Sequence, residues 1–533
     1  MLLKWELSAT TEGGHISETG EKKFSAGELH IETTVPKCTI QKAAGQIDME
    51  VGNDEKIFMN GYQTWTDCPE YSVNDHIRGL NKLPRKIIDH YSFDRYSDYH
   101  FVEYPDKKGI LHGFSWCWFR KGENYRLFAS LNERTGYTMF RYNHKEQKLF
   151  LEKDCAGLVC EGRVNFFDLF YAEGSEEEVF DAWFAALQIK PLTDKKLFGY
   201  SSWYNRYQDI SEAAIRQDLA GCMRLFEKGD LFQIDDGWEP FVGDWLTTDQ
   251  KKFPNGLKEI TEDIHKAGFK AGLWLAPFVA EEKSDVYRNH PDWFLKVNGG
   301  PWKAGCNWSG YYALDIDHPE VMEYLREVFR TVFDDWGFDL VKLDFLYAAA
   351  PYGNALETRA GRMYRAMEFL REVCGSKEIL GCGVPVMPAF GLVEYCRISC
   401  DVSLDWNDVP YMRIIHRERP STRNAVHNIL SRRALNGRAY GSDPDVFFLR
   451  EENCRLTKDE KEDLAKLDAL LGNVFLTSDD PSVYTMEMAE KYRVLRGFTK
   501  AENVKVYTDG GIRAEFDLNG RHQRIKLFKD KKW

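Results

Sequence analysis

Acidic residues close several apolar runs of the sequence, where their carboxyl groups could act as nucleophiles, acids or bases. Asp344 ends the run FDLVKLDF, and Lys342 lies two residues before it. On a strand these two side chains point the same way, because strand side chains alternate between faces. A carboxylate beside a fixed ammonium group stays ionised, as a nucleophile must. A structural ion pair at the end of a strand would have the same spacing, so both interpretations stay open.

A second acid, Asp401, closes the run EYCRISCD. Two carboxylates on separate strand ends that face one cavity are what glycoside hydrolysis requires. One attacks the anomeric carbon, and the other protonates the leaving oxygen and later takes a proton from water. A helix cap or a loop carboxylate is the alternative, and Asp405 and Asp408 lie close enough in the sequence to compete with Asp401 for the role.

A third acidic position joins two like charges. Asp235 and Asp236 close the run LFQIDD, and adjacent carboxylates must be stabilised by donors such as the hydroxyls of a bound sugar. Alternatively, one of them caps the following turn. Trp274 in GLWLAPF and Trp65 in GYQTW could stack on a sugar face or could belong to the core. The aromatic content of 14% does not separate these two roles.

Strand ends carry function in a β/α barrel, where the loops that follow the strands build the site. From Pro191 to Pro481, continuous apolar runs alternate with stretches of helical period, as buried parallel strands and their helices do. About eight units match a (β/α)8 TIM barrel. A doubly wound sheet is disfavoured because no G-x-G-x-x-G follows the first strand. The strand-like runs are LFGYSSW, LFQID, KAGLWLAP, YYALDI, FDLVKLDF, KEILGCG, EYCRISCD and VFLTSD.

The two flanking regions have a different pattern. Residues 1–189 begin with short alternating runs, which are typical of antiparallel strands in a sandwich. This region ends in Ser175–Gln188, where a serine cap and three glutamates predict a linker helix. Residues 482–533 alternate again around a turn at residues 509–511, which predicts a small C-terminal antiparallel β domain. The predicted domains are therefore 1–189, 190–481 and 482–533.

Composition narrows the classes of partner. The 533 residues carry 71 Lys and Arg against 84 Asp and Glu, a net charge of −13 that disfavours nucleic acid. No apolar run is long enough to span a membrane, and the start has no apolar signal core, so we expect a cytoplasmic protein. The 12 cysteines include no C-x-x-C and are expected to be free thiols. The 13 histidines form no H-x-H or H-E-x-x-H, so we expect neither a metal nor another cofactor.

Five motifs occur together in one order: QIDDGW, GLWLAPF, KLDFLYA, GCGVP and RISCD. In this order they resemble glycoside hydrolase family 36, the α-galactosidases of clan D, and GYQTW, GSDPDV and LTSDD extend the resemblance at both ends. The resemblance implies an N-terminal β-supersandwich, a central (β/α)8 barrel and a C-terminal β domain. It also implies a retaining exo-α-galactosidase that needs no cofactor and acts on short α-galactosides of the melibiose and raffinose type.

The resemblance further implies residue roles. Asp344 would be the nucleophile and Asp401 the acid/base. Ser399 and Cys400 stand before Asp401 where many members carry Gly or Pro. A galactosyl transferase, an α-N-acetylgalactosaminidase of the same family and an inactive sugar-binding protein remain alternatives, and the short N-terminal domain leaves the oligomeric state open. The implied substrate-binding residues are Trp65, Asp235, Asp236, Trp274, Lys342, Cys382 (near the 2-hydroxyl) and Arg397 (contacting the substrate).

Overall fold

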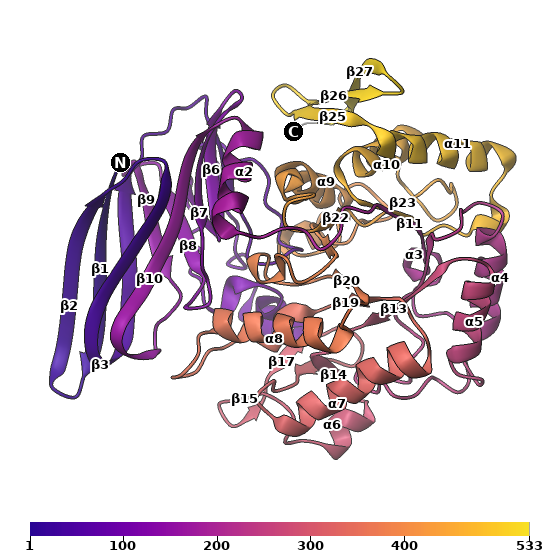
Figure 1. Cartoon of the computed structure of the whole chain (residues 1–533), viewed down its shortest axis with the longest axis horizontal. Coiled ribbons are helices and arrows are strands. Elements are labelled where there is room, and N and C mark those ends of the chain that lie inside the picture. Colours follow the sequence, from indigo (N-terminus) through magenta and orange to yellow (C-terminus); the bar gives the residue numbers. More distant parts are fainter. Residues whose placement is uncertain (532–533) are drawn as a thin grey trace.

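The computed structural model describes residues 1–531, and its first part is one large antiparallel sheet (Figure 1). The strand order is β4-β6-β7-β10-β3-β9-β8-β5, with β1 beside β3 and β2 beside β1. The end strands β4 and β5 contact each other, so the sheet nearly closes on itself. The strands are β1 (Leu2–Thr11), β2 (Gly14–Lys23), β3 (Gly27–Asp48), β4 (Lys56–Met59), β5 (Ile110–Phe114), β6 (Trp116–Lys121), β7 (Asn124–Ser130), β8 (Thr138–Asn143), β9 (Lys148–Lys153) and β10 (Val159–Gly174).

One helical segment leads from this sheet to the rest of the chain, and another lies between two of its strands. The predicted linker helix is present as α2 (Glu176–Leu187), with Ser175 and Glu178 forming the reciprocal hydrogen bonds of a capping box. Between β4 and β5 the chain leaves the sheet through α1 (Arg85–Tyr91) and the short 3₁₀ helices η1 (Phe93–Arg95) and η2 (Asp98–His100). The segment from β4 to β5 therefore supplies loops that reach beyond the sheet.

A parallel sheet of nine strands forms the second part, in the order β22-β21-β20-β19-β13-β12-β11-β24-β23. The first and last strands in this order, β22 and β23, are consecutive in the sequence and are separated only by Pro444 and Asp445. The two ends of the sheet therefore meet in one short stretch of chain. Nearly every residue of these strands is buried, which explains their continuous apolar runs. The strands are β11 (Leu197–Ser201), β12 (Leu231–Ile234), β13 (Lys270–Leu275), β19 (Leu340–Leu343), β20 (Glu378–Gly381), β21 (Tyr395–Arg397), β22 (Gly441–Asp443), β23 (Val446–Phe447) and β24 (Val474–Thr477).

Seven of the eight predicted strand runs belong to this sheet, and YYALDI is wrong. Its strand β18 (Tyr311–Ala313) instead pairs antiparallel with β14 (Val279–Glu281) and β17 (Lys303–Gly305) in a small separate sheet. The missing member is the stretch GSDPDVF, which forms β22 and β23. Its two aspartates and its proline interrupt the apolar pattern, because proline cannot donate to a strand ladder.

Helices follow most of these strands and cover the parallel sheet from outside (Figure 1). The helix α7 (Pro319–Arg330) continues as a π-helical turn, η3 (Thr331–Asp335), before β19. A short hairpin of β15 (Lys296–Val297) and β16 (Gly300–Pro301) follows α6 (Asp285–Asn289) in the sequence. The helices are α3 (Trp203–Arg206), α4 (Glu212–Cys222), α5 (Lys258–Lys266), α6 (Asp285–Asn289), α7 (Pro319–Arg330), α8 (Arg359–Cys374), α9 (Thr422–Ser431) and α10 (Lys458–Leu471).

The C-terminal region is β structure only in its second half, which corrects the prediction for residues 482–501. A helix, α11 (Met486–Gly497), comes first; Thr485 caps it, and Tyr492 and Leu495 are buried three residues apart. The strands β25 (Glu502–Tyr507), β26 (Ile512–Leu518) and β27 (Arg521–Leu527) then form the expected antiparallel sheet. The predicted turn at residues 509–511 joins β25 to β26. Among residues 1–531, no helix is long and apolar enough to cross a membrane.

The loop after β4 is fastened to the parallel sheet through Arg432, which follows α9. The buried guanidinium donates to the carbonyls of Thr64 (2.5 Å), Ile398 (2.8 Å) and Gln63 (3.2 Å), and to the amide oxygen of Asn60 (3.0 Å). The backbone N–H of Thr64 donates to the carbonyl of Val384 (2.9 Å) beyond β20. Loop 60–66 is therefore held in one position against the parallel sheet.

Replacing Arg432 with Met should destabilise the protein by about 3 kcal/mol, because several buried carbonyl groups would lose charged donors. We expect a lower midpoint of urea unfolding, followed by tryptophan fluorescence. Arg493, which is exposed on α11, provides the control as Arg493→Met. If both variants unfolded at the urea concentration of the parent, the fastening role of Arg432 would be wrong.

Candidate active site

A cavity of about 430 Å³ opens at the carboxyl ends of the parallel strands. Two of the nine predicted site residues, Cys382 and Arg397, do not line it and lie behind lining residues. The other seven come from the ends of β12, β13 and β19, from the segment after β21, and from the loop after β4. They are Trp65, Asp235, Asp236, Trp274, Lys342, Asp344 and Asp401.

Asp344 directly follows β19, and neighbouring donors fix both of its carboxylate oxygens. The indole N–H of Trp274 donates to Oδ2 (3.1 Å), and the backbone N–H of Phe345 donates to Oδ1 (2.9 Å). The residue is only 8% exposed. Burial raises the pKa of Asp344 above its ordinary value, while the neighbouring Lys342 acts in the opposite direction. The result is a desolvated, oriented carboxylate whose charge depends on Lys342.

Lys342 links Asp344 to the acidic pair at the end of β12. Its Nζ lies 2.9 Å from Oδ2 of Asp235, and both side chains are buried. Burial lowers the pKa of Lys342, but Asp235 and Asp344 raise it, and the net effect is a pKa above the ordinary value. The side chain of Gln233 also donates to Oδ2 of Asp235 (2.8 Å). Asp235 is therefore a carboxylate paired with a buried cation.

Asp236 is held by donors on one oxygen and lies beside a second carboxyl group. Its Oδ2 accepts from Gln208 Nε2 and Trp308 Nε1, both at 2.9 Å. Burial raises the pKa of Asp236, and burial together with Asp236 raises the pKa of the neighbouring Glu239 well above its ordinary value. Asp236 is therefore an oriented, desolvated acid at the cavity, with Glu239 next to it.

Asp401 is the most open of the carboxylates, with 36% of its side chain exposed. Arg397 donates to its Oδ1 (2.8 Å) and also pairs with Asp443 (3.2 Å) and Asp445 (2.8 Å). Since Arg397 is 3% exposed and its donors are taken by three carboxylates, it holds Asp401 from behind.

The two neighbouring acids that competed with Asp401 in the sequence do not line the cavity. Oδ1 of Asp405 accepts from the backbone N–H of Asp408, and Oδ1 of Asp408 accepts from the backbone N–H of Val409. Both side chains therefore stabilise the local turn, and of these three acids only Asp401 faces the cavity.

Trp65, in the loop after β4 of the antiparallel sheet, is one of the residues that line the cavity. Its indole N–H donates to Sγ of Cys382 (3.2 Å), and its ring packs edge-on against Phe345. Burial raises the pKa of the Cys382 thiol well above its ordinary value, so this sulfur is a neutral thiol. Gly383 follows with a φ of +59°, and a Cβ there would lie 2.7 Å from the Trp65 ring. The close approach of backbone and indole thus requires a glycine.

Ten further residues line the cavity without having been predicted. Trp203, Tyr207 and Gln208 lie in and just after α3, the short helix that follows β11, so the rule that strand ends carry function could have identified them. Trp308 lies between β17 and β18, and Tyr96 between η1 and η2, where no sequence pattern points to the cavity. The remaining five are Asn307, Phe345, His416, Glu418 and Pro420.

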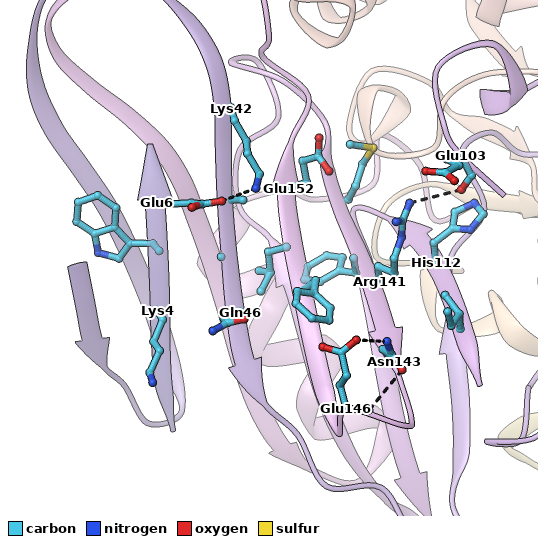
Figure 2. Close-up of a pocket in the computed structure, with 18 of the residues that line it drawn as sticks. Lys4, Glu6, Lys42, Gln46, Glu103, His112, Arg141, Asn143, Glu146 and Glu152 are labelled. Carbon is cyan, nitrogen blue, oxygen red and sulfur yellow. Dashed lines mark hydrogen bonds and ion pairs between the residues drawn. The ribbon is translucent and has the colours of Figure 1, made fainter. Parts of the chain in front are cut away.

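A larger hollow, of about 950 Å³, lies on the antiparallel sheet (Figure 2). Its charged side chains largely engage groups within the same face. Lys42 pairs with Glu6, Arg141 donates to the carbonyl of Glu103 (3.4 Å), and Asn143 donates to Glu146 (2.5 Å). None of the predicted site residues lines it. The chemistry therefore points to the smaller cavity.

Metal coordination has no candidate set in the described part of the chain. Within residues 1–531, no three His, Cys, Asp or Glu side chains are arranged to hold a metal ion. The carboxylates at the cavity are instead held by indole, amide, ammonium and guanidinium donors. Carboxyl groups held in this way can exchange protons with a ligand or attack it.

Comparison with protein families gives a match to the melibiase model over residues 199–368. An α-galactosidase of Escherichia coli is 32% identical over 164 residues, which cover 29% of this chain and 23% of that protein. The α-galactosidase AgaA of Geobacillus stearothermophilus is 32% identical over 151 residues, covering 27% and 20%. The matched segment thus spans less than a quarter of these relatives.

The similarity to solved structures extends over much more of the chain. An α-galactosidase from Thermus thermophilus, in complex with p-nitrophenyl α-D-galactopyranoside, has a TM-score of 0.73 and 26% identity, covering 93% of this chain and 98% of that one. The same enzyme in complex with stachyose has a TM-score of 0.71 and 27% identity, covering 88% and 99%. The family 36 α-galactosidase AgaA shares the fold, with a TM-score of 0.60 and 12% identity over 96% and 79% of the two chains.

Proposed function

Because residues 199–368 of this chain match the melibiase family model, we propose that the protein is a retaining exo-α-galactosidase that hydrolyses short α-galactosides. One observation carries the proposal: Asp344 and Asp401, from the ends of two different strands, line the same cavity. The T. thermophilus enzyme, whose fold this chain matches over 98% of its length, has structures with an aryl α-galactoside and with stachyose.

The proposed reaction gives these two acids different roles. Asp344 attacks the anomeric carbon while a protonated Asp401 transfers its proton to the glycosidic oxygen, so that the carbon–oxygen bond breaks and the leaving sugar departs. Asp401 then takes a proton from water, and the resulting hydroxide displaces Asp344 to release galactose with its configuration retained. Trp274 and the backbone of Phe345 hold the attacking carboxylate in place.

The remaining residues bind and orient the galactosyl group in this proposal. Asp235, Asp236 and Lys342 bind hydroxyls, Trp274 and Trp65 offer aromatic surface, and Cys382 lies between Trp65 and Asp344. Arg397, which the resemblance assigned to the substrate, acts through Asp401 in this proposal, because its three nitrogens are taken by Asp401, Asp443 and Asp445. The proposed domains are an N-terminal β-supersandwich in 1–189, a (β/α)8 barrel in 190–481 and a C-terminal domain in 482–533.

A panel of aryl α-glycosides tests the proposal. We expect the α-galactoside to be hydrolysed much faster than the α-glucoside and the α-N-acetylgalactosaminide. In the proposal Asp235 and Asp236 bind the 4- and 6-hydroxyls, and glucose turns its 4-hydroxyl the other way; Cys382 lies beside the 2-hydroxyl, where an N-acetyl group would need space. Faster release from the N-acetylgalactosaminide would favour that specificity instead. Galactosyl products that accumulate at high sugar concentration in place of free galactose would favour the transferase.

The acid side of the pH profile should depend on Lys342. The ammonium group opposes the rise in the pKa of Asp344 that burial causes, so Lys342→Met should raise this pKa further. Because Asp344 attacks only when deprotonated, the acid limb of kcat/KM on an aryl α-galactoside should move to higher pH. Lys266→Met, at an exposed position, should leave the limb unchanged. An acid limb that stays in place in Lys342→Met would contradict this coupling.

A further inference from the structure

Resting on the proposed function, we propose that His416 and Glu418 form the binding subsite for the leaving sugar of the α-galactoside. The ligand group they take is a hexopyranose with neighbouring hydroxyls, as in a disaccharide substrate. Both residues line the catalytic cavity, and neither was expected from the sequence.

The position of the two residues follows from the path of the chain. The chain that continues from Asp401, beyond the end of β21, returns to Asp401, because the backbone N–H of Ser421 donates to the carbonyl of Asp401 (2.9 Å). Glu418 is only three residues before Ser421. Since the acid/base must contact the glycosidic oxygen, the leaving sugar lies beside Asp401 and thus beside this segment.

The residues proposed to bind galactose lie at the end of a different strand of the parallel sheet. Asp235 and Asp236 follow β12, which is separated from β21 by β13, β19 and β20. The cavity therefore has one set of polar groups at the end of β12 and another after β21. A ligand that fills both sets has two sugar rings, one on each side of the scissile bond.

Glu418 lines the cavity on this side and carries an acceptor without a hydrogen-bond partner among residues 1–531. The residue is 4% exposed, and its Oε2 accepts from the hydroxyl of Tyr99 (3.1 Å). Its Oε1 is buried and has no hydrogen-bond partner in the described residues. A buried polar atom without a partner is costly, and a sugar hydroxyl in the cavity would satisfy it.

His416 is fixed beside Glu418 by aromatic packing. Its ring stacks on Tyr96 with centroids 4.6 Å apart and an interplanar angle of 2°, and Phe93 packs at 5.4 Å. Its Nδ1 lies 3.5 Å from Oε2 of Glu418, yet within residues 1–531 it has no hydrogen-bond partner. The imidazole and the carboxylate are thus adjacent at the cavity, and each has a buried polar atom that no described residue satisfies. In the proposal, neighbouring hydroxyls of a pyranose take up these two atoms.

The test compares two substrates that differ in their leaving group: melibiose releases a sugar, whereas α-galactosyl fluoride releases fluoride. In Glu418→Gln we expect kcat/KM for melibiose to fall by about tenfold or more, mainly through KM, since a charged acceptor is lost. Hydrolysis of α-galactosyl fluoride should stay within about twofold, as this substrate never reaches the subsite. His416→Phe, which keeps the stack on Tyr96, should show the same selective loss.

Glu487→Gln, at an exposed position on α11, serves as the matched control and should leave both substrates unaffected. Equal losses on the two substrates in Glu418→Gln and His416→Phe, or no loss on either, would overturn the subsite. A parent enzyme that hydrolysed neither substrate would instead overturn the proposed function, and the subsite with it.

Discussion

Asp344→Asn is expected to lower kcat/KM on an aryl α-galactoside by on the order of 10³-fold or more, because removal of a nucleophile leaves only binding and the remaining electrostatic stabilisation. The amide keeps the shape of the carboxylate but cannot form the covalent galactosyl intermediate. Turnover of the aryl substrate, measured by release of the phenol, checks this. Added azide should restore part of the activity, since a small anion can occupy the place of the missing carboxylate.

Asp334→Asn provides the control, since it makes the same change at an exposed position. Its kcat/KM should equal that of the parent. If Asp344→Asn kept full activity on the aryl α-galactoside, Asp344 would not be the nucleophile.

Asp401→Ala should produce a loss that depends on the leaving group. On melibiose or raffinose we expect a decrease in kcat/KM of about 10²–10⁴-fold, the usual contribution of general acid catalysis. On p-nitrophenyl α-galactoside the decrease should be smaller, because nitrophenolate leaves without a proton. Comparing kcat/KM on the two kinds of substrate measures the difference.

Asp405→Ala is the informative control for Asp401, since this neighbour points into its own turn and not into the cavity. It should show no dependence on the leaving group. Equal losses of Asp401→Ala on melibiose and on the aryl substrate would argue against its role as the acid.

Much of the parallel sheet could be predicted because burial on both faces imposes continuous apolar runs. That constraint identified seven strands and, through their ends, Asp235, Asp344 and Asp401. It failed where other demands on the chain were stronger. The stretch 441–447 pairs as β22 and β23 around Pro444, and its Asp443 and Asp445 are used to bind Arg397. A strand that carries two acids and a proline has no apolar signature.

The cavity residues on loops were harder to predict than those at strand ends. The register of a strand is fixed by backbone pairing, so the position of a residue at its end can be inferred from a short motif. Tyr96, Trp308 and Glu418 also line the cavity, but they come from loops whose course depends on long-range contacts. Tyr96, for example, is placed by a hydrogen bond from Gln63 to its carbonyl (2.7 Å) and by the ring of His416. No local pattern encodes such contacts.

The fastening of loop 60–66 has a consequence for the modularity of the molecule. The stretch with the melibiase match ends at residue 368, before Asp401, and begins long after Trp65. A fragment limited to that stretch would contain Asp344 but lack Asp401, and its cavity would lack Trp65. If the antiparallel sheet were replaced by an unrelated one, the parallel sheet would lose the indole of Trp65 at its cavity. The two parts of the chain can therefore be exchanged between homologues only together.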